Sequence, residues 1–268
     1  MKLKDFVTLG NVLGGLASMV SAIHGDLQWA CYFMFIAWAF DSMDGTVARL
    51  TGGGNKFGVV LDNTADLVAY SLAPALIVYL AYVSPRVVGG AGWPPWAAFI
   101  LASLPAAFGC IRFARNDVKD IIMPTFHMGL PRTVYGLYIA TLFTSHIFRN
   151  SWITDPSSWF NPVIYAVSAV FIATTSFLIL TLLPYYAKPK RGSGTKPFIV
   201  FSVWWFLLTT ACSLVVGLLY DMRIFLDTAF LNFTVYVWFQ HLAIPPEKRR
   251  EAKRYVKQLT KEWKQEMG

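Results

Sequence analysis

The sequence predicts an all-α membrane protein, a polytopic bundle of about eight spanning helices with both termini on the cytoplasmic side. The first reason is composition: 56% of the 268 residues are hydrophobic, only 14% are charged, and the mean hydropathy is +0.48. A soluble domain of this size is far less apolar. The second reason is that long apolar stretches fill nearly the whole chain. The third is that Lys and Arg gather in alternate joints between these stretches.

The apolar stretches set the expected helices. A spanning helix needs roughly 20 mostly apolar residues, and the joints between the stretches carry Gly, Pro, Asn and Asp, which are typical of turns and loops. The expected spans are residues 6–23, 28–48, 59–83, 93–111, 131–148, 160–186, 197–219 and 224–243.

The distribution of positive charge predicts the orientation of these spans. With an even number of spans both termini lie on one side, and 20 of the 23 Lys and Arg residues then fall on that side. Only Arg86, Arg149 and Arg223 fall in the opposite loops. Because cytoplasmic loops carry the excess of Lys and Arg, we expect the termini to be cytoplasmic.

The division into regions follows from a change in composition near Pro245 and Pro246. We expect a membrane domain over residues 1–244 and a basic amphipathic cytoplasmic tail over residues 245–268. The tail carries one apolar stripe at helical spacing, which is typical of a helix lying on an anionic lipid surface. A solvated basic tail or a protein-contact helix fits the pattern equally well. The stripe consists of Ala252, Tyr255, Val256, Leu259 and Trp263.

Four aspartates lie within or beside two otherwise apolar segments, where a charged side chain is costly. Asp41 and Asp44 are three residues apart, and Asp62 and Asp66 are four apart. Each pair therefore shares one face of a helix. Because the intervening loop is cytoplasmic in the predicted topology, the two helices run antiparallel and bring both pairs together near the same membrane surface.

Converging carboxylates repel one another unless cations lie between them. Carboxylate oxygens suit Mg²⁺, Mn²⁺ or Ca²⁺, and neither His nor Cys is present in the cluster to favour zinc. Small residues one turn away leave room for a ligand, and Arg49 offers donors to phosphate oxygens. The spacing alone also fits a buried ion-pair network or an ion pathway, as in a cation transporter. The small residues are Gly45, Ala48 and Gly58.

The spacing D-x2-D-G-x2-A-R-x8-G-x3-D-x3-D resembles the defining motif of the CDP-alcohol phosphatidyltransferases. Four further stretches resemble the phosphatidylserine synthases within that family, including the archaetidylserine synthases. They are TLGNVLGG at residues 8–15, NKFGVVLDNTADLVAYSLAPAL at 55–76, RFARND at 112–117 and FHMGLP at 126–131. The continuation Arg132-Thr133 departs from the more apolar sequence expected in bacterial members, and this leaves the acceptor open.

The resemblance implies that a CDP-linked lipid donates its phosphatidyl group to an alcohol while CMP leaves. It implies two divalent metal ions, Mg²⁺ or Mn²⁺ with Ca²⁺ as an alternative. Asp41, Asp44, Asp62 and Asp66 would be the metal ligands, and Asp66 would also take the proton from the acceptor hydroxyl. Residues that would bind the CDP moiety are Thr8, Asn11, Gly45, Ala48, Arg49 and Gly58.

We expect L-serine as the acceptor. Its carboxylate requires a fixed cation on the cytoplasmic side, which Arg112, Arg115 and Arg132, with Asn116 beside them, would supply. The same arginines would also suit inositol phosphate or glycerol phosphate. The remaining expectations are a location in the cell membrane, contact with membrane lipids, a homodimer by resemblance and no nucleic-acid partner. Neither the chemistry of the lipid tails nor the preferred metal follows from the sequence.

Overall fold

The computed structural model describes residues 3–50, 56–83, 92–118, 126–149, 160–186, 197–244 and 246–267. The described part of the chain is almost entirely helical, with one short two-stranded sheet. In chain order the elements are α1 (Leu3–Ile23), α2 (Leu27–Leu50), α3 (Lys56–Leu67), the π-helical turn η1 (Val68–Leu72), α4 (Ala73–Val83), α6 (Pro95–Val118), β1 (Phe126–Met128), α7 (Arg132–Thr144), α8 (His146–Arg149), α10 (Phe160–Leu180), β2 (Pro184–Tyr186), α11 (Pro197–Leu219), α12 (Met222–Ala243) and α13 (Pro246–Met267).

Each expected span corresponds to mainly helical structure, which confirms the all-α fold class, although the span expected over 131–148 is divided into α7 and α8 at the extended residue Ser145. By length and composition, four helical stretches among the described residues are suited to crossing a membrane. The total of eight spans and the side of the termini stay predictions. The four stretches are Lys4–Ile23, Phe57–Val83, Pro95–Arg115 and Phe160–Leu180.

Two expected ends are wrong, and the first is that of the span expected over 93–111, which continues as helix α6 to Val118. The span expected over 160–186 ends as a helix at Leu180, and Pro184–Tyr186 form strand β2 instead. Strand β2 pairs antiparallel with β1, so that His127 lies opposite Tyr185. Pro184 is a signal against helix, because a proline donates no backbone hydrogen bond. The pairing itself gives no local signal, because the partner strand β1 lies far away in the sequence. Apolar composition alone could not reveal this pairing.

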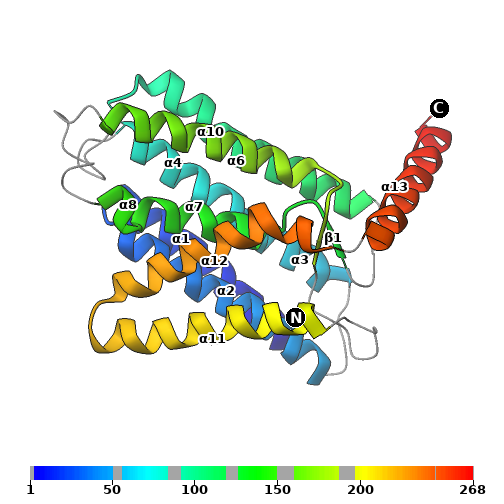
Figure 1. Cartoon of the computed structure of the whole chain (residues 1–268), viewed down its shortest axis with the longest axis horizontal. Coiled ribbons are helices and arrows are strands. Elements are labelled where there is room, and N and C mark those ends of the chain that lie inside the picture. The colour runs from blue at the N-terminus through cyan, green and yellow to red at the C-terminus, as the bar shows by residue number, and fades with distance from the viewer. Residues whose placement is uncertain are drawn as a thin grey trace.

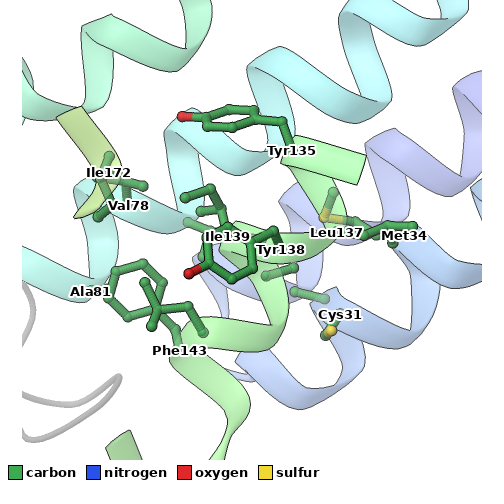
Figure 2. Close-up of a cluster of buried hydrophobic side chains, with 14 of the residues drawn as sticks. Cys31, Met34, Val78, Ala81, Tyr135, Leu137, Tyr138, Ile139, Phe143 and Ile172 are labelled. Atoms are coloured by element: carbon green, nitrogen blue, oxygen red, sulfur yellow. The ribbon is translucent and has the colours of Figure 1, made fainter. Parts of the chain in front are cut away.

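Helix α7 forms the centre of the core, because nearly all of its residues are buried and it contacts α2, α4, α10, α12 and η1. Figure 2 shows Tyr138 and Phe143 of α7 among apolar side chains of its neighbours, including Met34 of α2 and Val78 of α4. Gly136 brings α7 against η1, because a Cβ there would lie 2.9 Å from the Cα of Tyr70. The core thus fixes η1, the segment that follows Asp66.

The outer faces of the bundle are apolar. Leu13 of α1, Val167 of α10 and Leu218 of α11 are examples of large aliphatic side chains that are at least half exposed. A soluble protein rarely exposes apolar surface on this scale, so this chain is an integral membrane protein. Figure 1 shows α13 standing apart from the bundle, at the end where the N-terminus and the start of α3 also lie.

Candidate active site

Close packing of α1 against its neighbours frames the site. A Cβ on Gly14 would lie within 2.9 Å of the backbone of Ala37 in α2, and a Cβ on Gly15 would lie 2.8 Å from the Cα of Ala69 in η1. Side chains of any other type at these two positions would push the helices apart. The TLGNVLGG stretch therefore places Thr8 and Asn11 beside the aspartates of α2 and α3.

The aspartates of α2 and α3 converge as the sequence predicts. One carboxylate oxygen from each of Asp41, Asp62 and Asp66 lies within 4.8 Å of the others. Asp44 is not part of this tightest group. Its Oδ2 accepts a hydrogen bond of 2.8 Å from the Thr8 hydroxyl, and its carboxylate interacts electrostatically with Asp62. The four carboxylates thus form one acidic cluster with a core of three.

The cluster fits a divalent metal ion. Three half-buried carboxylates at this separation repel one another unless a cation lies between them, and oxygen-only ligands suit Mg²⁺, Mn²⁺ or Ca²⁺. Asp62 Oδ1 is buried and makes no hydrogen bond to any residue that the structure describes. Since an unsatisfied buried charge is costly, this oxygen is available to a metal.

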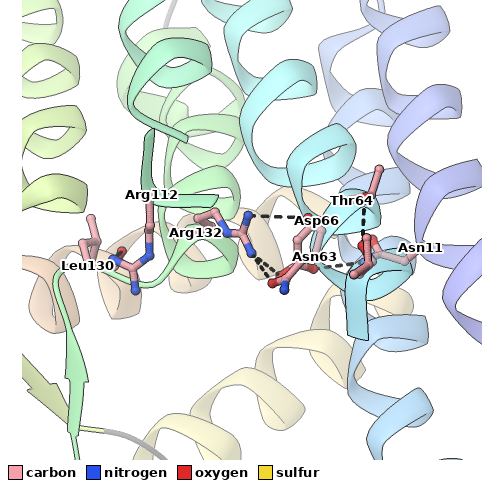
Figure 3. A network of polar contacts seen from close by, with 8 residues as sticks. Asn11, Asn63, Thr64, Asp66, Arg112, Leu130 and Arg132 are labelled. Atoms are coloured by element: carbon pink, nitrogen blue, oxygen red, sulfur yellow. Dashed lines mark hydrogen bonds and ion pairs between the residues drawn. The ribbon is translucent and has the colours of Figure 1, made fainter. Parts of the chain in front are cut away.

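Polar side chains hold Asp66 from two sides (Figure 3). The amide of Asn11 donates a 3.2 Å hydrogen bond to Oδ1, while Arg132 Nη2 lies 3.4 Å from Oδ2. Arg132 Nη2 also donates to the Asn63 side-chain oxygen at 3.1 Å, and Nη1 donates to the Asn63 carbonyl at 3.5 Å. The guanidinium is only 6% exposed. Asp66 is therefore fixed in orientation by groups from two other helices, α1 and α7.

Arg112 and Arg115 lie differently from Arg132. The Nη1 of Arg112 donates to the carbonyls of Leu130 at 2.8 Å and Ile179 at 3.0 Å, and the Nη1 of Arg115 donates to the Leu180 carbonyl at 3.0 Å. Both side chains thus connect α6 to the end of α10. The buried Nε and Nη2 of Arg115 make no hydrogen bond to any described residue, so this guanidinium retains donors for an anion.

The residues expected around CDP lie at the edge of the cluster. A Cβ on Gly45 would meet no described atom within 4 Å, so open space adjoins α2 next to Asp44. Gly58 instead faces Lys4, whose side chain passes directly over it. Ala48 is half-buried on α2. The side chains of Arg49 in α2 and Asn116 in α6 lie outside the described part of the structure.

Two features of the site were not predicted from the sequence. The turn η1 begins two residues after Asp66, with the Ala73 N–H bonded to the Val68 carbonyl. Such π-helical turns are frequent at functional sites, but the alternation of apolar residues gives no sign of one. The second feature is Lys4, which is 7% exposed beside the cluster. The sequence pattern shows Lys4 only as one of the positive charges at the start of the first span.

Comparison with known proteins identifies a matching family. The profile of the family described as CDP-alcohol phosphatidyltransferase matches residues 1–171. The archaetidylserine synthase of Methanothermobacter thermautotrophicus is 28% identical over 196 residues, which cover 72% of this chain and 73% of that protein.

Two bacterial proteins named CDP-diacylglycerol–serine O-phosphatidyltransferase are also similar. The protein of Helicobacter pylori is 34% identical over 128 residues, 47% of this chain and 51% of that protein. The protein of Bacillus subtilis is 23% identical over 184 residues, 68% of this chain and 89% of that protein. The chain thus spans about half the length of the Helicobacter relative and most of the length of the Bacillus relative.

Proposed function

Because this chain belongs to the CDP-alcohol phosphatidyltransferase family, we propose that it transfers a phosphatidyl or archaetidyl group from a CDP-linked lipid to the hydroxyl of serine, releasing CMP, with the help of a divalent metal. The observation that carries the proposal is the convergence of Asp41, Asp62 and Asp66 within 4.8 Å on the positions of the family motif. The cation-transporter alternative is not retained, since the matched family consists of transferases.

The metal would be held by Asp41, Asp62 and Asp66, with Asp44 beside them. Oxygen ligands from carboxylates favour Mg²⁺ or Mn²⁺. A divalent ion bound there would neutralise the charge that develops on the diphosphate during transfer. Family membership supports this dependence, and the acidic cluster offers the donor atoms.

Asp66 is the proposed general base. The serine oxygen attacks the phosphorus that carries the lipid, the bond from that phosphorus to the CMP oxygen breaks, and the hydroxyl proton passes to an Asp66 oxygen. The hydrogen bond from Asn11 and the ion pair with Arg132 hold this carboxylate in one orientation. Orientation of this kind raises the rate by keeping the reacting atoms in place.

Arg132 is the best-placed cation for the acceptor carboxylate, because it is buried beside Asp66 and its planar fork suits a carboxylate. Arg115 supplies further unsatisfied donors, and Arg112 completes the positive surroundings. The names of the relatives favour serine. Inositol phosphate or glycerol phosphate is the second candidate class, since three arginines would also suit a phosphorylated acceptor.

The orientation that fits the proposal places the acidic cluster at the cytoplasmic face of the cell membrane, where CDP-lipids and serine meet. The membrane domain over 1–244, the basic tail over 245–268 and the homodimer belong to the same proposal. Helix α13 spans Pro246–Met267 at the cluster's end of the bundle, which supports a cytoplasmic tail (Figure 1).

The test is CMP release by the purified full chain from radiolabelled CDP-diacylglycerol and its ether-lipid analogue. Serine, glycerol phosphate and inositol phosphate are supplied side by side, with Mg²⁺, with Mn²⁺, or with a chelator. We expect a labelled lipid product with serine and no product with the chelator. Product with only a phosphorylated acceptor would replace serine, and the absence of product with every acceptor and metal would overturn the proposal.

A further inference from the structure

The first turn of α1 places two charged side chains in the interior. Lys4 is 7% exposed and Asp5 is 0% exposed. Lysine and aspartate are almost never buried unless they are paired or have a function. The positive-inside pattern explains a lysine near the end of a span, but it does not explain a lysine whose side chain is buried.

The Lys4 side chain lies against the glycine of the family motif. A Cβ on Gly58 would lie 2.3 Å from both Cε and Nζ of Lys4, so any larger residue there would displace the ammonium. Gly58 stands one turn before Asp62 on α3, and the Lys4 charge interacts electrostatically with the Asp62 carboxylate. The ammonium is therefore at the edge of the acidic cluster.

Thr8 extends the same face of α1 toward the cluster. It lies one turn after Lys4, and its hydroxyl lies 3.1 Å from the Lys4 carbonyl and 2.8 Å from Asp44 Oδ2. Lys4 and Thr8 therefore form a polar edge of α1 that faces α2 and α3. Open space adjoins this region at Gly45.

We propose that Lys4 is a donor-binding residue whose ammonium contacts the diphosphate of the CDP-linked lipid. This assignment rests on the proposed function. An ammonium has three donors on a flexible stem and binds phosphate as a point charge. The Lys4 charge interacts electrostatically with the Asp62 carboxylate and lies beside Gly58, so a diphosphate bound over the cluster would offer the ammonium a second anionic partner.

The alternative is that Lys4 only balances the charge of the acidic cluster. The two roles differ in what they do to ligand affinity. A phosphate contact strengthens binding of ligands that carry a diphosphate and has no effect on the bare nucleoside. A counter-ion to the carboxylates opposes metal binding, so its removal tightens binding of the metal and of the metal-dependent nucleotide.

The experiment compares the wild type with Lys4→Met and Lys4→Arg in the full chain. Isothermal titration in Mg²⁺ buffer measures the affinity for CDP and for cytidine, and initial rates give the KM for the CDP-lipid and for serine. We expect Lys4→Met to weaken CDP binding and raise the donor KM by about 10- to 100-fold. Cytidine affinity and the KM for serine should stay unchanged, and Lys4→Arg should restore most of the loss.

Lys253→Met on α13 is the matched control, since it removes an exposed lysine. Unchanged CDP affinity in Lys4→Met, or tighter affinity, would overturn the assignment, as would an equal loss of CDP and cytidine affinity. These results leave the proposed function intact when the wild type releases CMP. A wild type that neither binds CDP nor releases CMP would remove the proposed function and the Lys4 assignment together.

Discussion

Replacing Asp66 by asparagine separates proton transfer from binding. The substitution removes the charge and keeps the shape of the side chain. Asn11 is able to adapt, because its own Oδ1 is buried without a hydrogen bond to any described residue, and a rotated amide would let this oxygen accept from the amide introduced at position 66. Arg132 keeps its bonds to Asn63. We therefore expect Asp66→Asn to fold and to retain the contacts around the site.

The expected loss falls on turnover. Removing a general base lowers kcat by about 10²- to 10⁴-fold, which corresponds to about 3 to 5 kcal/mol in activation free energy. The KM for the CDP-lipid should change by no more than a few fold, because Asp41, Asp44 and Asp62 remain. Initial-rate kinetics and titration with CDP in Mg²⁺ buffer measure the two effects separately.

Asp221→Asn provides the control, since Asp221 is the exposed N-cap of α12 and asparagine caps a helix equally well. This variant should keep wild-type kinetics. Wild-type kcat in Asp66→Asn would remove Asp66 from proton transfer. Loss of CDP binding along with turnover would reduce its role to that of a metal ligand.

Three further predictions concern the surroundings of the cluster. Arg132→Gln should raise the KM for serine by about 10- to 100-fold and leave the CDP affinity unchanged; an unchanged KM for serine would remove Arg132 from the acceptor site. Gly136→Ala should destabilise the protein by about 1 to 3 kcal/mol, because the added Cβ would lie 2.9 Å from the Cα of Tyr70. Thermal melting in detergent checks this, and an unchanged melting temperature would contradict the close packing of α7 on η1. Gly45→Ala should leave the melting temperature unchanged or raise it, since the new Cβ meets open space and alanine favours a helix. Its KM for the CDP-lipid should nevertheless rise, and a wild-type KM would show that the donor does not use this space.

Much of the fold follows from local sequence signals. Apolar length predicts the helices, because a helix in lipid must satisfy its backbone within itself. The ends of α1, α2, α11 and α12 fall within a few residues of the predicted ends. The strands β1 and β2 were not predictable in this way, since each gains its hydrogen bonds from a partner more than 50 residues away.

The acidic cluster was likewise predicted only in part from the sequence. Helical spacing places Asp41 and Asp44 on one face, and Asp62 and Asp66 on another, and the short loop between the helices makes them antiparallel. Spacing does not reveal that Asp44 turns to Thr8 while the other three aspartates form the tightest group. That choice depends on how closely α1 approaches α2, which the glycines of α1 permit.

The arginines were the hardest to assign from sequence, because a charge at a helix end has the same pattern whether it binds a substrate or a carbonyl. Arg112 and Arg115 donate to backbone carbonyls at the end of α10, whereas Arg132 pairs with Asp66. Lys4 likewise has the pattern of ordinary cytoplasmic charge, yet it is buried over Gly58.

The helical membrane fold, the family and the residues of the acidic cluster follow from the sequence alone, because each of these depends on composition or on spacing along one or two neighbouring helices. The contacts of the cations with residues of the cluster, in contrast, follow from tertiary packing. The ion pair of Arg132 with Asp66 and the packing of Lys4 against Gly58 join residues more than 50 positions apart, so they depend on packing distances between helices.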